Sequence, residues 1–194
     1  MRITYSVARI LGAIAESKAS DLSVPMAIAL VDGEGGLLFF GRMEGALPAS
    51  TEIAVSKAYT SAVSRMATHE LGKLAQPGGE LYGIEHTHNG RIVLFGGGFP
   101  LRLNGEVAGA IGISGGSVNE DVRVAEHIVN ALEEMEYWSK RIKEYLPKQR
   151  LEYLRISHLE NRLMEVFEQM NCSLPADAPS FLAGAILLAD SVRQ

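Results

Sequence analysis

The residues best suited to chemistry gather between positions 76 and 117. His86 and His88 stand two positions apart there, directly before an Asn89-Gly90 turn. In an extended segment, side chains two positions apart face the same side, so both imidazoles could reach one ligand. Neutral imidazole binds metal ions and haem iron, and it also acts as a general base. Two interpretations stay open: His86 and His88 hold a metal or haem iron, or they are exposed loop histidines.

A second group of residues could bind an anionic ligand. Arg91 is a candidate for gripping a carboxylate or a haem propionate, because a guanidinium donates two parallel hydrogen bonds to such groups. Lys57 lies in a predicted helix. With Tyr82, His88 and Arg91 it would form an anion pocket, provided that this helix lies over the glycines further along the chain. The alternative for Lys57 is an ordinary solvated helix lysine.

Three consecutive glycines, Gly96, Gly97 and Gly98, follow the histidines. They lack the Gly-Lys-Ser/Thr ending of a phosphate loop and lead into Phe99-Pro100 rather than into a helix. A dinucleotide-binding fingerprint fails for the same reason. The glycines therefore indicate a tight loop or bulge at a sheet edge, or a close approach of the backbone to a ligand.

Composition limits the class of protein. The chain has 194 residues, 47% of them hydrophobic, which suits one domain with an appendage. A net charge of −5 argues against nucleic acid as a partner. The single cysteine, Cys172, excludes an intramolecular disulfide and fits a reducing compartment. No apolar run reaches the roughly 20 residues that cross a membrane. We expect a soluble, cytoplasmic protein.

The hydrophobic periodicity predicts a mixture of helices and strands. Helices are expected up to about 20–21, over 49–66 and 68–75, and from about 119 toward 145. Strands are expected over 24–31, 37–43, 91–95, near 101–103 and over 106–113. Ser50 or Thr51 is the expected N-cap of the second helix, and Thr68 that of the third. Hairpin-length links between strands exclude a doubly wound parallel sheet. The expected fold class is α/β (α+β), an antiparallel sheet with helices packed on it.

A second region follows Pro147. Apolar residues repeat at helical spacing over 151–170, a loop spans 171–179, and a last short helix is predicted over 181–192. We therefore expect a domain over 1–146 and a helical hairpin over 147–194. The apolar face of this hairpin is too large for one subunit to cover easily, which favours a contact between subunits of a homo-oligomer.

Several separate blocks resemble the GlcG/HbpS family, also called the PduO C-terminal-like family. These blocks are VPMAIALVD, GRMEGA, KAYTSA, ELGKLAQPGGELYGI, NGRIVLFGGGFPL and GEVAGAIGISGG, and they lie in unbroken order within residues 3–136. The resemblance implies a profilin-like fold, assembly into homo-oligomers, and haem or corrinoid binding in some members. It also implies an association with glycolate oxidation or with diol and glycerol metabolism. No histidine precedes His69, so a haem ligand on the first helix could not be histidine.

The leading expectation is an accessory protein that binds a small anionic ligand or a tetrapyrrole, either haem or a corrinoid. Gly96, Gly97 and Gly98 would offer backbone donors, Arg91 and Lys57 would meet carboxylates, and His86 or His88 would be the axial ligand. One alternative is an enzyme acting on a small hydroxy or keto acid, with His88 as general base and Arg91 orienting the carboxylate. Another is a non-catalytic oligomeric assembly protein.

Overall fold

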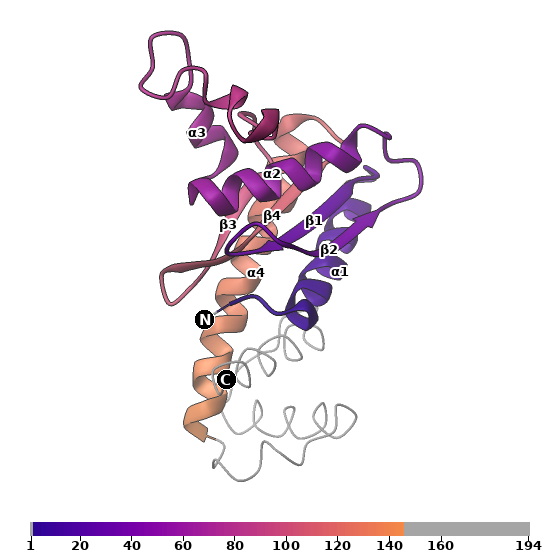
Figure 1. Cartoon of the computed structure of the whole chain (residues 1–194). Helices are drawn as coiled ribbons and strands as arrows, with labels where there is room; N and C mark the ends of the chain where they lie inside the picture. Colours follow the sequence, from indigo (N-terminus) through magenta and orange to yellow (C-terminus); the bar gives the residue numbers. More distant parts are fainter. Residues whose placement is uncertain (1, 146–194) are drawn as a thin grey trace. The chain divides into compact units, whose positions relative to one another are not determined.

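The computed structural model describes residues 2–145 (Figure 1). The helices are α1 (Tyr5–Asp21), α2 (Ser50–Ser64), α3 (Thr68–Leu74) and α4 (Val118–Tyr145), with short 3-10 turns η1 (Ile84–His86) and η2 (His88–Gly90). The strands are β1 (Ala27–Asp32), β2 (Leu37–Arg42), β3 (Gly98–Leu103) and β4 (Glu106–Ser114). The chain divides into two compact units, residues 1–132 and 133–194, and the fold described below belongs to the first. Among residues 2–145, no helix is both long and apolar enough to cross a membrane.

The four strands form one antiparallel sheet in the order β2-β1-β4-β3. The central pair, β1 and β4, runs in register from Ala27 opposite Ser114 to Asp32 opposite Gly109. Both central strands are almost wholly buried, whereas the edge strand β2 is partly exposed. The predicted antiparallel sheet flanked by helices is confirmed.

Helix α2 covers one face of the sheet through small side chains. Ala54, Ala58 and Ala62 are buried against alanine and valine side chains of β1 and β4. A Cβ added to Gly112 of β4 would collide with the backbone of α2 at Ala54 and Ala58. Alanine on the helix and glycine on the strand therefore allow an approach that larger residues would prevent.

Helix α1 packs on the opposite face. Residues that alternate along a strand point to opposite sides, so Ile28 and Leu30 face away from α2. Phe39 pairs with Leu30 in the register of β1 and β2, and its ring lies against Gly12 of α1. The alternation of β1 thus separates a core under α2 from a core under α1.

The strand predicted over 91–95 is absent, and this prediction was wrong. The segment has the short apolar run that is typical of a buried strand, and Ile92 is indeed buried. Its backbone groups, however, bond to a helix side chain: the Val93 N–H donates to Thr60 Oγ1 at 3.0 Å, and that hydroxyl donates to Arg91 O at 3.4 Å. Within residues 2–145, the other predicted strands and helices appear close to their expected ranges.

The predicted N-caps were also wrong. Helix α2 is preceded by Ala49, which makes no side-chain cap, and Ser50 is a buried helical residue. Thr68 is the first residue of α3, and its hydroxyl bonds to Gly98 instead, accepting from the N–H at 3.1 Å. These hydroxyls serve tertiary packing rather than local capping. The boundary near Pro147 and the helical hairpin over 147–194 lie outside the described residues.

Candidate functional site

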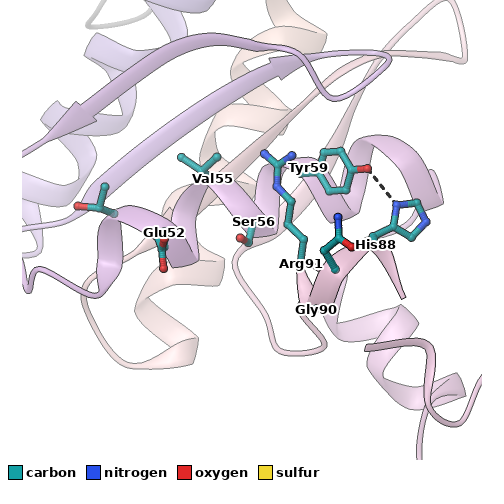
Figure 2. A pocket seen from close by; sticks show the side chains of 9 residues that line it. Glu52, Val55, Ser56, Tyr59, His88, Gly90 and Arg91 are labelled. Atoms are coloured by element: carbon teal, nitrogen blue, oxygen red, sulfur yellow. Dashed lines mark hydrogen bonds between the residues drawn. The ribbon is translucent and has the colours of Figure 1, made fainter. Parts of the chain in front are cut away.

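A pocket of about 660 Å³ lies where α2 meets the loop around η2 (Figure 2). One side is the exposed face of α2, and the other is the loop that ends at Arg91. The lining residues are Thr51, Glu52, Val55, Ser56, Tyr59, His88, Asn89, Gly90 and Arg91. The volume falls in the range of small-molecule sites, and the lining is mixed polar and apolar.

The loop side of the pocket has an unusual backbone. His88, Asn89 and Gly90 have φ values of 50°, 58° and 74°, so three consecutive residues are left-handed. Tight turns precede and follow them: the Thr87 hydroxyl donates to Ile84 O at 2.6 Å, and the Arg91 N–H donates to His88 O at 3.3 Å. A left-handed histidine is sterically disfavoured, and such residues persist where other contacts hold them.

Tyr59 joins the two sides of the pocket. Its hydroxyl lies 3.0 Å from His88 Nδ1, and the two rings meet edge to face with centroids 5.8 Å apart. The Arg91 guanidinium carbon lies 3.9 Å from the centre of the Tyr59 ring, which is cation–π contact. Within the described part of the chain, no carboxylate pairs with this guanidinium. Tyr59, His88 and Arg91, named here the pocket cluster, thus present an imidazole and an unpaired cation to one cavity.

This arrangement suits an anionic ligand. A guanidinium stacked flat on a ring still offers the N–H groups along its edge to a carboxylate. With Nδ1 of His88 next to the Tyr59 hydroxyl, Nε2 is the ring nitrogen that remains for a ligand, an iron atom or a proton. The grouping of His88 with Arg91, expected from the sequence, is therefore what the structure shows.

The other predicted site residues lie elsewhere. His86 does not line the pocket: its side chain is 84% exposed, with Nε2 3.8 Å from Glu85 Oε1. The two histidines occupy separate 3-10 turns rather than an extended strand, so the argument that placed them on one side does not apply. No group of three His, Cys, Asp or Glu side chains among residues 2–145 could hold a metal ion. Tyr82 is exposed and also lies outside the lining.

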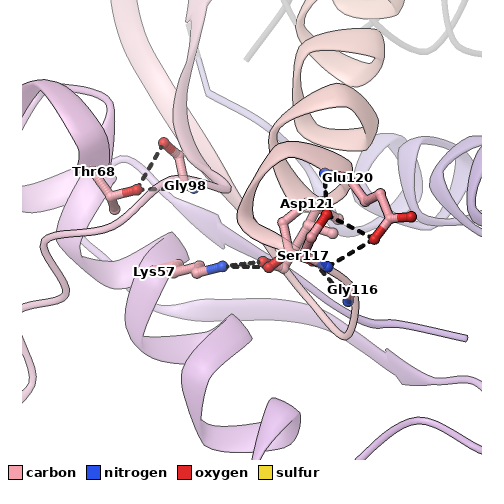
Figure 3. A network of polar contacts seen from close by, with 8 residues as sticks. Lys57, Thr68, Gly98, Gly116, Ser117, Glu120 and Asp121 are labelled. Carbon is pink, nitrogen blue, oxygen red and sulfur yellow. Dashed lines mark hydrogen bonds and ion pairs between the residues drawn. The ribbon is translucent and has the colours of Figure 1, made fainter. Parts of the chain in front are cut away.

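Lys57 is fully buried and does not reach the pocket (Figure 3). Helix α2 does lie over the glycines, as the anion-pocket prediction required. The ammonium, however, is already occupied: Nζ donates to Asp121 Oδ2 and to Ile113 O, both at 2.7 Å, and lies 4.8 Å from the centre of the Phe95 ring. Lys57, Asp121 and Phe95 are named here the inner cluster. Lys57 is therefore not available to an external anion.

Burial dominates the electrostatics of the inner cluster. It lowers the pKa of Lys57 below the ordinary value of 10.5, and the attraction of Asp121 offsets only part of this. It likewise raises the pKa of Asp121 above 3.8, against the opposing hydrogen bonds from Lys57 and the backbone. The second oxygen, Oδ1, accepts from the Gly116 N–H at 3.1 Å. The pair thereby fastens α2 to the end of β4 and to the first turn of α4.

The start of α4 is fixed by a second, exposed contact beside this pair (Figure 3). Ser117 precedes the helix, and its N–H donates to Glu120 Oε2 at 2.7 Å while its hydroxyl accepts from the Glu120 N–H at 3.4 Å. This reciprocal cap lowers the pKa of the Glu120 carboxyl, first through the hydrogen bond from the Ser117 backbone. Asp121 is thus held in position by the turn as well as by Lys57.

Gly96, Gly97 and Gly98 are buried against protein rather than exposed to a ligand. Gly97 has φ +109°, and a Cβ there would come within 2.7 Å of both Ile113 O and Lys57 Nζ. A Cβ on Gly98, the first residue of β3, would come within 2.5 Å of Thr68. The glycines are required because the chain passes tightly over the inner cluster at the sheet edge. Their predicted role as ligand donors gains no support from this geometry.

Tyr59 is the pocket residue that the sequence interpretation missed. The core stripe of this helix is the alanine series Ala54, Ala58 and Ala62. The opposite stripe, at positions 52, 55, 56 and 59, carries the pocket-lining side chains at helical spacing. Assigning the stripe of small residues to the core would have left Tyr59 on the other face of the helix, among polar residues that could line a pocket.

Known proteins share this architecture. A family model described as "Haem degrading protein HbpS-like" matches residues 3–130. An uncharacterized 15.0 kDa protein in the dhaT-dhaS intergenic region of Citrobacter freundii is 41% identical over 133 residues, which are 69% of this chain and 94% of that protein. Among solved structures, the protein chain of the PduOC:heme complex is 38% identical to this chain. The two superpose with a TM-score of 0.65, over 67% of this chain and 94% of the PduOC chain.

A third relative is longer. The corrinoid adenosyltransferase PduO of Citrobacter freundii is 40% identical over 132 residues, 68% of this chain but 39% of the enzyme. The chain therefore spans well under half of that relative. The range matched by the family model, residues 3–130, includes the sheet, α2 and the pocket cluster of this chain. From the family match and the identity to the Citrobacter protein, the chain belongs to the HbpS-like family.

Proposed function

We propose that this protein is an accessory haem-binding protein whose ligand lies in the pocket between α2 and the loop 88–91. The observation that carries the proposal is the pocket cluster, in which an imidazole and an unpaired guanidinium face one cavity of about 660 Å³. The haem complex of PduOC and the haem-degrading description of the family support the choice of haem.

The side chains present fit the two ends of a haem. Arg91 would bind a propionate through the edge of its guanidinium. His88 would offer Nε2 as an axial ligand, since neutral imidazole is a common ligand of haem iron. Val55 and the ring of Tyr59 provide apolar contact. When bound, the iron would supply ligand-exchange or one-electron chemistry, while the chain's own residues bind and orient the group.

Haemin titration followed by absorbance tests the proposal. We expect a saturable Soret shift with one haem per chain, lost in His88→Ala. The matched control is His86→Ala, which removes an exposed imidazole two positions away and outside the pocket. No saturable shift in the unchanged protein, or an equal loss in His86→Ala, would contradict this assignment. A saturable change with cob(II)alamin alone would assign the site to a corrinoid, the ligand of the PduO relative.

The same three side chains favour a second candidate, an enzyme acting on a small hydroxy or keto acid. Arg91 would bind the carboxylate, and His88, held at Nδ1 by the Tyr59 hydroxyl, would remove a proton through Nε2. Acid-dependent turnover lost in both His88→Gln and Arg91→Met would support it. If the wild-type protein turned over every acid screened no faster than the two variants, this enzyme function would be excluded.

The wider setting is also part of the proposal. The family resemblance implies an association with glycolate oxidation or with diol and glycerol metabolism, and this association stays a prediction. Homo-oligomer formation through 147–194 and a cytoplasmic location stay predictions. Sedimentation of the full chain beside a chain ending at residue 146 tests the first of these. An unchanged mass would contradict assembly through this segment.

A further inference from the structure

Tyr59 contacts both groups that face the ligand. We propose that Tyr59 is a positioning residue: its ring holds Arg91, and its hydroxyl holds His88 so that Nε2, not Nδ1, faces the pocket. This inference rests on the proposed function for the identity of the ligand. The position of the imidazole can be tested without any ligand.

Tyr59 is itself held firmly. It lies on α2, whose opposite stripe is buried in the core. Its ring also packs against the β1–β2 hairpin at Gly35, where a Cβ would come within 2.7 Å of Tyr59 Cδ2. Gly35 has φ +89°, so the hairpin reaches the ring with a residue type that suits this conformation. The ring is therefore a fixed surface on which Arg91 can stack.

His88, in contrast, lies on an exposed loop and has a left-handed backbone. The imidazole of His88 contacts the hydroxyl of Tyr59, at 3.0 Å, and the edge of the Tyr59 ring. A disfavoured backbone on an exposed loop needs a contact of this kind to hold it in one conformation. The hydroxyl thus links α2 to the exposed loop that carries His88.

The contact between the Tyr59 hydroxyl and His88 Nδ1 is compatible with either tautomer, and the proposed ligand-binding role requires one of them. For Nε2 to accept a proton or bind iron, Nδ1 must carry the hydrogen of the neutral ring. Nδ1–H then donates to the Tyr59 oxygen. The hydroxyl hydrogen of Tyr59 is left to donate to a bound anion or to water. Partners of this kind orient metal-binding histidines, and their loss typically weakens binding by about 10- to 100-fold.

Imidazole ¹⁵N NMR of the ligand-free protein tests the positioning directly. Tyr59→Phe keeps the ring that stacks on Arg91 and removes only the hydroxyl. We expect the His88 nitrogens to shift toward the Nε2–H tautomer in Tyr59→Phe. The matched control is Tyr5→Phe, which removes the hydroxyl of another exposed tyrosine on α1 and should leave His88 unchanged. Identical ¹⁵N signals of the His88 imidazole in the wild-type protein and in Tyr59→Phe would overturn the inference.

Haemin affinity provides the second readout. We expect Tyr59→Phe to weaken haem binding by about tenfold, and Tyr59→Leu to weaken it further because Arg91 loses its stacking surface. Adding Tyr59→Phe to His88→Ala should change nothing more, since the hydroxyl acts through His88. An unchanged affinity in Tyr59→Phe would overturn the positioning role. If the unchanged protein binds no haem, the proposed function fails, and the NMR measurement still decides whether Tyr59 positions His88.

Discussion

Two polar clusters lie on different sides of the same helix. The inner cluster is built on Lys57 and the pocket cluster on Tyr59, two residues later, and positions two apart on an α-helix point roughly 200° apart. Each contains a cation against an aromatic ring: Lys57 over Phe95 and Arg91 over Tyr59. Only the surroundings differ, since Lys57 is fully buried while the pocket is open to solvent.

The burial of each cation decides its role in the two clusters. A charge removed from water must be paired, and Lys57 has Asp121 and a carbonyl at 2.7 Å. Arg91 is only partly buried and has no carboxylate partner among residues 2–145, so its donors stay available to a ligand. The inner cluster therefore holds α2 to β4 and α4, whereas the pocket cluster is the one that we propose binds a ligand.

The largest expected effect breaks the inner cluster. Lys57→Met leaves Asp121 buried without its cation and should lower the free energy of unfolding by about 3–5 kcal/mol. His88→Ala, in the pocket cluster, should change it by less than about 0.5 kcal/mol. Urea unfolding followed by circular dichroism measures both. The double variant Lys57→Met/Asp121→Leu should recover most of the loss, and equal costs for Lys57→Met and His88→Ala would contradict the comparison.

The next effect concerns the glycines above the inner cluster. Gly97→Ala combines a φ of +109° with a Cβ 2.7 Å from Ile113 O, and should cost more than about 2 kcal/mol of unfolding free energy. Gly105→Ala is the matched control, because Gly105 has φ +81° with nothing within 4 Å of a Cβ. It should cost about 1 kcal/mol. Thermal unfolding of both variants separates the cost of the steric contact at Gly97 from the cost of placing alanine at a positive φ. Equal losses of unfolding free energy in the two variants would show that the contact is unimportant.

A pH series sharpens the same comparison. In Lys57→Met, burial without the cation should raise the folded-state pKa of Asp121 further above 3.8. A carboxyl group whose pKa is higher in the folded state stabilises that state at pH values below its pKa in the unfolded chain. This contribution is lost as the pH rises through the pKa of the folded state. The stability of the variant relative to the unchanged protein should therefore fall from pH 4 upward, by at most about 1.4 kcal/mol per pH unit. A difference that stays constant across this range would show that Asp121 is not the affected group.

The sequence could predict those features that depend on residues close together in the chain. It could not predict those that depend on partners far apart in the chain. The short apolar runs, the hairpin links and the family blocks predicted the antiparallel sheet and the main helices correctly. Local patterns failed where a distant partner decided the outcome. The segment 91–95 has strand-like residues, but Thr60 takes its hydrogen bonds.

The candidate site shows the same limit. His88 and Arg91 are close in sequence, and their grouping was predicted correctly. Lys57 was assigned to the pocket because its partner Asp121 lies 64 residues later, which no local spacing reveals. Tyr59 was missed because an aromatic residue at helical spacing suits a core as well as a pocket. Pairing across the fold, rather than residue type, separates the two clusters.

The smallest expected effect lies in the pocket cluster. Arg91→Lys keeps the charge but loses the flat stacking on Tyr59 and the two-point grip on a carboxylate. Haem affinity should fall by about two- to fivefold, the value of an exposed cation–π contact, with unfolding unchanged. Arg102→Lys, an exposed arginine of β3 that lies outside the pocket lining, is the control and should bind haem normally. Equal affinities for the two variants would remove Arg91 from the site.

The central claim is that the ligand binds on the Tyr59 side of α2 and not on the Lys57 side. Amide NMR during titration with the diamagnetic gallium(III) protoporphyrin tests it most directly. We expect the largest shift changes at Glu52, Tyr59 and residues 88–91, whereas the signals of Lys57, Gly97 and Asp121 should stay nearly unchanged. The largest changes around Gly96–Gly98 and Asp121, with the pocket residues unaffected, would contradict it.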